Sequence, residues 1–408
     1  MRACNTRDLG NLKNHLIMHH TNRREFLKKL LSGGAAIASV GCPPFLCQQG
    51  LSMFSPGASG KAPGSSFNKI NLPDMEAMYY RQLAGNRVRC ELCHQNCTIS
   101  NRRRGNCKNR ENRQGKLYSL VYSRPSAINI DPIEKEPQHH MLPGQQMICV
   151  GTAGCNFRCR HCHNWHLSQR SIEEIGTHFH YTPADIVQAA KENGLPAISA
   201  TYNEPTVFYE YVLDIAKLAQ KEGIRILWHS NAYMHTEPLK ELLKYTDSVT
   251  IDLKGFSQQA YENSAGKLEP VLNNLKTIHK SGVWLEVVNL IIPTINDSVE
   301  EIKAMCQWVK QELSPEVPLH FSRFFPSYKL TQISPTPLET LEKAHDIARK
   351  AGLHYVTLGN VPGHRLNSTF CPECDKVLIR RVHFTVTENN IRNGSCAECN
   401  HPIPGIWN

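Results

Sequence analysis

The chain has 408 residues, of which 40% are hydrophobic, and a formal net charge of +10. Its length allows one large domain with smaller modules, and no uncharged apolar run approaches the roughly 18 residues that a membrane-spanning helix needs. The positive charge is local, because residues 1–30 carry +5, residues 81–116 carry +8 and the remainder carries −3. This excludes a chain that is basic throughout. We expect residues 81–116 to form a solvated basic face, with nucleic-acid binding as the alternative.

The amino terminus has the pattern of an export signal. Residues 21–29 read TNRREFLKK and precede a mildly apolar stretch at residues 30–40, which resembles a twin-arginine leader. We expect a leader at residues 1–47 and a flexible linker, rich in Pro, Gly and Ser, at residues 48–75. The protein is then exported or held at the membrane. Lipidation at Cys42 and a chance basic start to a disordered tail are the alternatives.

Twelve of the 16 cysteines gather in three clusters, with Cys149 counted beside the second cluster. Clustered cysteines favour metal binding over disulfides. The first cluster has the spacing C-x2-C-x3-C-x9-C and predicts a four-ligand site in a module at residues 76–145: Cys90, Cys93, Cys97 and Cys107. Zinc is the preferred metal, and an auxiliary iron–sulfur cluster is the alternative. Six basic residues surround this site: Arg102, Arg103, Arg104, Lys108, Arg110 and Arg113.

From residue 146 to residue 362, β-rich apolar runs alternate with helical patterns. The predicted strands are Met147–Val150, Ala197–Thr201, Arg225–His229, Ser248–Leu253, Trp284–Ile292, Pro318–Phe321 and Tyr355–Leu358. The predicted helices are Pro183–Asn193, Pro205–Glu222, Glu237–Lys244, Leu268–Ser281, Ser298–Glu312 and Pro337–Ala351. Repeated βα units imply a parallel sheet, so we expect an α/β fold built as a partial (β/α)6 barrel. A doubly wound open sheet is the alternative, although no G-x-G-x-x-G supports dinucleotide binding.

The second cysteine cluster lies on a loop directly after the first predicted barrel strand. Cys155, Cys159 and Cys162 have the spacing C-x3-C-x2-C. Three thiolates can ligate three irons of a [4Fe-4S] cluster and leave the fourth iron open. The spacing resembles that of the radical S-adenosylmethionine (SAM) enzymes, in which SAM chelates the open iron and is cleaved to a 5′-deoxyadenosyl radical. A zinc site completed by His161 or His163 is the alternative.

Polar residues follow several later strands, at the end of a barrel where catalytic groups gather. Glu204 can hold the charged amine of SAM, with Asn203 as a polar neighbour, or it can instead mark a helix start. Asn231 follows the third strand and can bond a ribose or a carboxylate. Asp252 and Lys254 share one face of the fourth strand, where Lys254 can meet a ligand carboxylate or pair with Asp252.

The last module, residues 363–408, has the pattern of a zinc ribbon. Its two C-x2-C pairs supply four ligands: Cys371, Cys374, Cys396 and Cys399. A tetrahedral Cys4 zinc ion would stabilise a module too small to fold on its own core. Rubredoxin-like iron is the alternative.

Several longer segments resemble the AmmeMemoRadiSam-system radical SAM enzymes, which are relatives of the pyruvate formate-lyase activating enzymes. The similarity runs from about residue 76 to 362 and includes residues 90–97, 105–107, 131–135, 151–169, 201–206, 252–256, 292–297 and 359–361. It implies that Cys155, Cys159 and Cys162 ligate the cluster, that Asn203 and Glu204 meet the methionyl amine of SAM, and that Lys254 meets its carboxylate. Relatives have Arg-Phe-His-Pro after the sixth strand. This chain has Phe325 in place of that histidine, so a ribose or adenine contact is not carried over there.

The sequence therefore predicts a radical SAM enzyme that needs a low-potential electron donor of the flavodoxin or ferredoxin type. From the resemblance to activating enzymes, we expect the substrate to be a protein residue. An RNA- or small-molecule-modifying radical enzyme and a non-enzymatic iron–sulfur protein are the alternatives. SAM and low-potential donors are cytoplasmic, whereas the leader indicates export, so the compartment stays open.

Overall fold

A computed structural model describes residues 75–176 and 178–408 of the chain. The predicted leader and the predicted linker up to residue 74 lie outside the described residues. None of the helices in the described part has the length and apolarity that crossing a bilayer requires.

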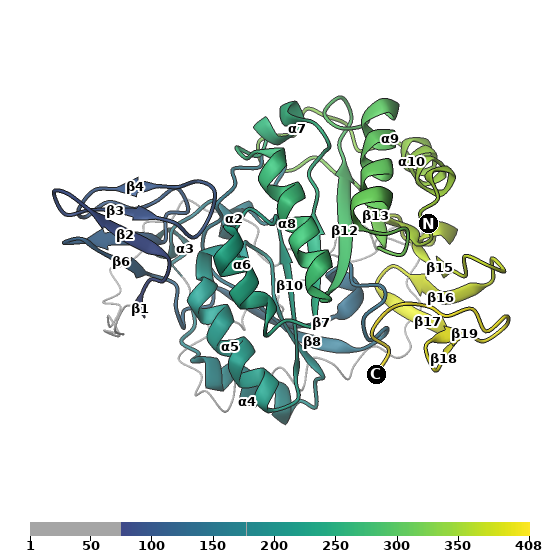
Figure 1. The fold of residues 1–408 in the computed structure, drawn as a ribbon, viewed down its shortest axis with the longest axis horizontal. Coiled ribbons are helices and arrows are strands. Elements are labelled where there is room, and N and C mark those ends of the chain that lie inside the picture. Colours follow the sequence, from purple (N-terminus) through teal and green to yellow (C-terminus); the bar gives the residue numbers. More distant parts are fainter. Residues whose placement is uncertain (1–74, 177) are drawn as a thin grey trace, which may run out of the picture. The chain divides into compact units, whose positions relative to one another are not determined.

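An eight-stranded sheet forms the centre of the fold (Figure 1). Its strands, in spatial order, are β14 (Val356–Gly359), β13 (Leu319–Arg323), β12 (Trp284–Ile291), β11 (Ser248–Asp252), β10 (Arg225–Ser230), β9 (Ala197–Ala200), β8 (Gln146–Gly151) and β7 (Ala127–Pro132). The strands β8 to β14 are parallel, and β7 pairs antiparallel with β8. Among the described residues β14 and β7 are the two edges of this sheet, so the barrel is open. The predicted partial barrel is confirmed.

Helices pack along the outer face of the sheet. They are α4 (Pro183–Glu192), α5 (Tyr209–Lys221), α6 (Thr236–Leu243), α7 (Gln258–Glu262), α8 (Leu268–Ser281), α9 (Val299–Trp308) and α10 (Leu338–Ala351). Short turns extend two of them, η2 (Pro205–Phe208) before α5 and the π-helical η3 (Val309–Leu313) after α9. Thr182 and Ser298 cap α4 and α9, because their side chains accept hydrogen bonds from the first turns of these helices. Gly282 and Gly352 end α8 and α10 in the left-handed conformation.

The strand β7 and the segment after it extend the barrel beyond its βα repeats. The short helix η1 (Ile133–Lys135) follows β7, and the chain then enters the core, where Gln138, His139 and His140 are buried. Gln138 donates a hydrogen bond to Thr250 Oγ1 on β11 (2.7 Å) and accepts one from Ser248 (2.7 Å). Residues 127–145 thus pack with the barrel sheet.

Small sheets form the two flanking modules. At the N-terminal side the strands are β1 (Met75–Glu76), β2 (Tyr80–Leu83), β3 (Arg87–Cys90), β4 (Thr98–Ile99), β5 (Arg110–Arg113) and β6 (Lys116–Ser119). At the C-terminal side η4 (Arg365–Asn367) leads into β15 (Thr369–Phe370), β16 (Val377–Val382), β17 (Thr385–Asn389), β18 (Ile391–Arg392) and β19 (Ser395–Cys396). Arg110 fixes the first module to α5, because its guanidinium lies 2.6 Å from the Glu210 carboxylate and both side chains are buried.

Candidate active site

One cavity of about 450 Å³ lies at the carboxyl ends of the barrel strands. All eight residues that the sequence predicts for the cluster and for SAM line it: Cys155, Cys159, Cys162, Asn203, Glu204, Asn231, Asp252 and Lys254. They come from the loop after β8 and from the ends of β9, β10 and β11. The fold therefore gathers these residues at one place, as expected for a barrel of βα units.

The cysteine loop runs from the end of β8 to the short helices α2 (Trp165–Ser168) and α3 (Ile172–Ile175). Asn203 braces its beginning: the side-chain oxygen accepts a hydrogen bond from Thr152 N (3.0 Å) and the amide donates to Gly154 O (2.8 Å). Its contacts within the chain thus make Asn203 a positioning residue for the loop. A direct role of Asn203 toward SAM stays a prediction.

Glu204, shortly after β9, is buried and accepts hydrogen bonds at both carboxylate oxygens. Thr206 Oγ1 (2.6 Å) and Ser230 Oγ (2.7 Å) donate to Oε1, and Asn231 N (3.0 Å) donates to Oε2. Burial raises the pKa of Glu204, although these hydrogen bonds act in the opposite direction. Glu204 also caps η2 through Thr206 N, so the helix-start interpretation is correct. Among the described residues a single donor reaches Oε2, so this oxygen still has capacity for a ligand cation.

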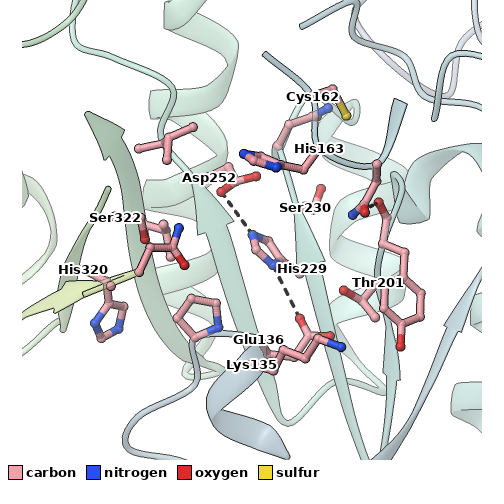
Figure 2. Close-up of a pocket in the computed structure, with 18 of the residues that line it drawn as sticks. Lys135, Glu136, Cys162, His163, Thr201, His229, Ser230, Asp252, His320 and Ser322 are labelled. Carbon is pink, nitrogen blue, oxygen red and sulfur yellow. Dashed lines mark hydrogen bonds and ion pairs between the residues drawn. The ribbon is translucent and has the colours of Figure 1, made fainter. Parts of the chain in front are cut away.

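A row of alternating charges crosses the cavity, and Figure 2 shows the part of it formed by Asp252, His229 and Glu136. Lys254 Nζ lies 2.6 Å from Asp252 Oδ2, Asp252 Oδ1 lies 3.1 Å from His229 Nε2, and His229 Nδ1 lies 3.5 Å from Glu136 Oε2. Burial disfavours the charged imidazole, but Asp252 and Glu136 raise the pKa of His229 to about 10. The predicted pairing of Lys254 with Asp252 is therefore present. Because the ammonium of Lys254 has further donors, contact with a ligand carboxylate stays a prediction.

His229 and Glu136 belong to the site but could not be predicted from the sequence. Nothing local marks them, because each acquires its role from partners on other elements: His229 on β10 faces Asp252 on β11, and Glu136 also accepts a short hydrogen bond from Ser199 on β9. The only signal was the position of His229 near the end of a predicted strand.

A second polar network lies under the cavity, around the fully buried Glu286 of β12. Glu286 accepts hydrogen bonds from the backbone of His139 (2.9 Å) and His140 (2.8 Å) and lies 2.7 Å from His320 Nε2. Burial opposes ionisation of Glu286, but the contact with His320 prevails and lowers the pKa to about 2. Arg381 of β16 donates to His139 O (2.7 Å). The network thus links the C-terminal module to the cavity floor.

The C-terminal module also contributes to the cavity wall. His383 and Phe384, in the turn between β16 and β17, line the cavity beside residues of the barrel. Val382, the last residue of β16 before this turn, is 51% exposed. The buried Arg381 anchors this turn. The module therefore takes part in shaping the site and is not a separate appendage.

The spacing of the thiols tests which metal each cysteine set fits. A zinc ion with Zn–S bonds of about 2.3 Å holds two sulfurs about 3.8 Å apart. In the C-terminal set, Cys371 and Cys399 Sγ are 3.6 Å apart, Cys374 and Cys396 Sγ are 3.8 Å apart, and all four sulfurs lie within 4.8 Å of one another. This geometry fits a single tetrahedral ion.

The cysteine loop differs from the C-terminal set in this spacing. In the described part of the chain, Cys155, Cys159 and Cys162 are not among the groups whose ligand atoms lie within 4.8 Å of one another, and neither His161 nor His163 completes such a group. The three cysteines nevertheless line one cavity. Burial raises the pKa of all three thiols, so metal binding must displace their protons. The residues present therefore fit a larger cluster with an open iron and not a single zinc ion.

The basic segment near the first cysteine set is largely paired with acids of the chain. Four of the six basic residues form ion pairs: Arg104 with Glu173 (2.8 Å), Lys108 with Glu174 (3.2 Å), Arg110 with Glu210 (2.6 Å) and Arg113 with Glu111 (2.7 Å). Two of these acids, Glu173 and Glu174, belong to α3, directly after the cysteine loop. Through Arg104 and Lys108 the segment thus contacts the helix that follows the cysteine loop.

Gly154 provides a test of the contact between the N-terminal module and the cysteine loop. A methyl group at Gly154 would overlap Cys107 O and Asn109 Nδ2, and the residue has φ +91°. We expect Gly154→Ala to lower the free energy of unfolding of the metal-free protein by about 1–3 kcal/mol more than Gly223→Ala. Gly223 (φ +69°) has nothing within 4 Å of an added methyl group, so its variant carries only the backbone cost of about 1–2 kcal/mol. Equal effects in chemical denaturation would contradict this close packing.

An open parallel barrel with three cysteines on the loop after its first strand defines a class, the enzymes that use SAM at an iron–sulfur cluster. The family model of the radical SAM superfamily matches residues 149–309. The chain is 43% identical over 330 residues to the uncharacterized protein MJ0808 of Methanocaldococcus jannaschii, covering 80% of this chain and 98% of that protein. The chain belongs to the radical SAM superfamily and is an enzyme.

Two further likenesses are more distant. The pyruvate formate-lyase-activating enzyme of Clostridium pasteurianum is 27% identical over 176 residues, which are 41% of this chain and 71% of that enzyme. The crystal structure of SuiB from Streptococcus suis bound to S-adenosylmethionine is 15% identical, with a TM-score of 0.43 over 55% of this chain and 53% of that one. The homology to activating enzymes confirms the resemblance, and the narrower AmmeMemoRadiSam assignment stays a prediction.

Proposed function

We propose that this enzyme uses SAM to remove a hydrogen atom from a residue of a protein substrate. The observation that carries the proposal is the convergence of the three cysteines and the polar strand ends on one cavity. Cys155, Cys159 and Cys162 would hold the cluster, which together with SAM supplies a one-electron cleavage that yields a carbon-centred radical. The relation to activating enzymes supports a protein residue as substrate.

The chain's own residues would orient SAM and exclude water from it. Glu204 offers a carboxylate oxygen for the methionyl amine, and Lys254 offers an ammonium for the carboxylate. Asp252 and His229 hold Lys254 in place through the row of charges. These groups are fixed before the ligand arrives, which reduces the cost of ordering them on binding.

The role of Glu204 can be tested by Glu204→Gln, which keeps the shape of the side chain and removes its charge. A charge-assisted hydrogen bond contributes about 1.5–3 kcal/mol, so we expect the Kd for SAM to rise by about 10- to 100-fold. Binding is measured by equilibrium dialysis with labelled SAM on the cluster-loaded enzyme. Glu222→Gln, at a surface carboxylate 42% exposed, is the control. An unchanged Kd with an intact fold would leave Glu204 only as the cap of η2.

The substrate class can be tested by following deuterium. Cells are grown in deuterated medium, and their extract is separated into protein, RNA and small-molecule fractions. Each fraction is incubated with the loaded enzyme, unlabelled SAM and dithionite, and the 5′-deoxyadenosine is analysed by mass spectrometry. Deuterium transferred from the protein fraction supports the proposal. Transfer from RNA or from small molecules would overturn it in favour of one of the two alternative radical chemistries.

The C-terminal set would hold zinc, which the sulfur spacing supports. Because the β16–β17 turn lines the cavity, this zinc would stabilise one wall of the substrate site. The proposed twin-arginine leader would place the enzyme outside the cytoplasm or at the membrane. Cell fractionation of the full chain, compared with an Arg23→Lys/Arg24→Lys variant, tests the leader. Retention of both forms in the cytoplasm would contradict it.

A further inference from the structure

The N-terminal cysteine set, Cys90, Cys93, Cys97 and Cys107, converges at the end of the β3–β4 hairpin. Cys90 N donates to Cys97 O (3.0 Å), and Asn96 N donates to Cys93 O (3.0 Å), so the first three cysteines share one tight turn. Asn106 N lies 3.4 Å from Cys97 Sγ, which brings the neighbouring Cys107 to the same place. The four residues are buried or partly buried and have no disulfide partner.

The N-terminal set, like the cysteine loop, lacks the close sulfur spacing of the C-terminal set. Among the described residues, only the C-terminal set has three or more ligand atoms within 4.8 Å of one another. A single zinc ion would require sulfurs about 3.8 Å apart. Four converging thiols at wider spacing suit an iron–sulfur cluster, in which different irons take the thiolates. This spacing favours the auxiliary iron–sulfur cluster, which the sequence leaves as the alternative to zinc.

The N-terminal cysteine set lies against the loop that would hold the SAM cluster. The carbonyl of Cys107 packs on Gly154, the residue before Cys155. On the other side of Cys155, Gln95 Nε2 donates to Asn156 O (2.9 Å). Cys155 is thus flanked on both sides by contacts with the module. In the described part of the chain, no residue from 75 to 130 lines the cavity, so a cluster here would not touch the substrate.

We propose that the N-terminal cysteine set binds a second iron–sulfur cluster, which passes an electron to the cluster at Cys155, Cys159 and Cys162. The inference rests on the proposed radical function. An external one-electron donor of the ferredoxin or flavodoxin class is oxidised by one electron, and the second cluster is reduced. The same electron then moves to the SAM cluster, so the second cluster returns to its oxidised form and no bond or proton is exchanged. The position behind the loop, away from the cavity, fits electron entry and not substrate binding.

Metal analysis of the full chain tests the site first. The chain is purified without oxygen and reconstituted, and iron, sulfide and zinc are measured per chain. With one cluster at each site we expect about six irons if the second cluster is [2Fe-2S] and about eight if it is [4Fe-4S], with about one zinc. About four irons and two zincs would overturn the proposal. This count does not depend on SAM cleavage, so it can succeed or fail independently of the proposed function.

Variants separate the two clusters. Cys93→Ala/Cys97→Ala is expected to lose the additional iron while its zinc content is unchanged. A variant with Cys155, Cys159 and Cys162 replaced by Ala is expected to keep the additional iron, with an electron paramagnetic resonance signal on reduction. Absence of that signal in a folded, reconstituted variant would contradict a second cluster.

The electron route is tested by comparing two reductants. With a ferredoxin-type donor, we expect Cys93→Ala/Cys97→Ala to slow 5′-deoxyadenosine formation by at least about tenfold, whereas with dithionite, which can reach the SAM cluster directly, the loss should be several times smaller. Equal losses with both reductants, in a variant that still binds SAM, would overturn the relay. Loss of cleavage in the wild-type protein itself would instead count against the proposed function.

Discussion

Replacement of Asp252 by asparagine is expected to lower the free energy of unfolding by about 3 kcal/mol. Asp252 lies between two cations, with Lys254 Nζ at 2.6 Å and His229 Nε2 at 3.1 Å. Removing the central carboxylate leaves two positive charges facing each other in the cavity. Breaking a buried ion pair in this way costs about 3–5 kcal/mol, and we take the lower end because the Asp252 side chain is 27% exposed. Chemical denaturation of the metal-free protein measures the change.

The matched control is Glu237→Gln on α6. Glu237 pairs with Lys240 at 3.4 Å, but its side chain is 78% exposed, so the loss should stay below about 1 kcal/mol. We also expect the double variant Asp252→Asn/Lys254→Met to be more stable than Asp252→Asn alone, because it removes one of the stranded cations. If Asp252→Asn behaves like Glu237→Gln, the row of charges does not contribute to stability.

Replacement of Cys155, Cys159 and Cys162 by alanine is expected to remove about four irons per chain and abolish SAM cleavage. In the proposed function these three thiols, which line the cavity, hold the cluster, and a [4Fe-4S] cluster without its thiolate ligands is not retained. Iron, sulfide and the visible absorbance of the cluster are measured after anaerobic reconstitution. Zinc at the C-terminal set should be unchanged, which shows that the module is still folded.

Cys306→Ala is the control for this loss. Cys306 is buried in α9 and does not line the cavity, so its replacement should leave the iron content unchanged. An alanine triple variant that keeps its full iron content would show that the cluster is held elsewhere.

The fold was predictable because its signals are local. Each parallel strand is a short apolar run between helices, and the cap residues Thr182 and Ser298 and the glycines Gly282 and Gly352 mark helix ends directly. The strand β7 was not predicted. Its segment AINIDP mixes polar and apolar residues and ends in proline, and it becomes a strand because it pairs with β8 at the edge of the sheet.

Two features made part of the site predictable: the spacing of the cysteines in the loop and the position of polar residues at the carboxyl ends of the strands. The C-x3-C-x2-C loop identifies its own chemistry, and the ends of parallel strands meet at one edge, which brought Glu204, Asn231 and Lys254 together. Contacts between distant elements could not be predicted. The pairing of His229 with Glu136 and the anchoring of Arg381 on His139 join segments that no local pattern relates.

SAM cleavage by the reconstituted wild-type enzyme is the direct test of the radical mechanism. The full chain, loaded with iron and sulfide under anaerobic conditions, is mixed with SAM and dithionite, and 5′-deoxyadenosine and methionine are quantified by mass spectrometry. We predict that both products form in equal amounts and that neither forms with the variant lacking Cys155, Cys159 and Cys162. A fully loaded wild-type enzyme that binds SAM but releases no 5′-deoxyadenosine would contradict the radical mechanism.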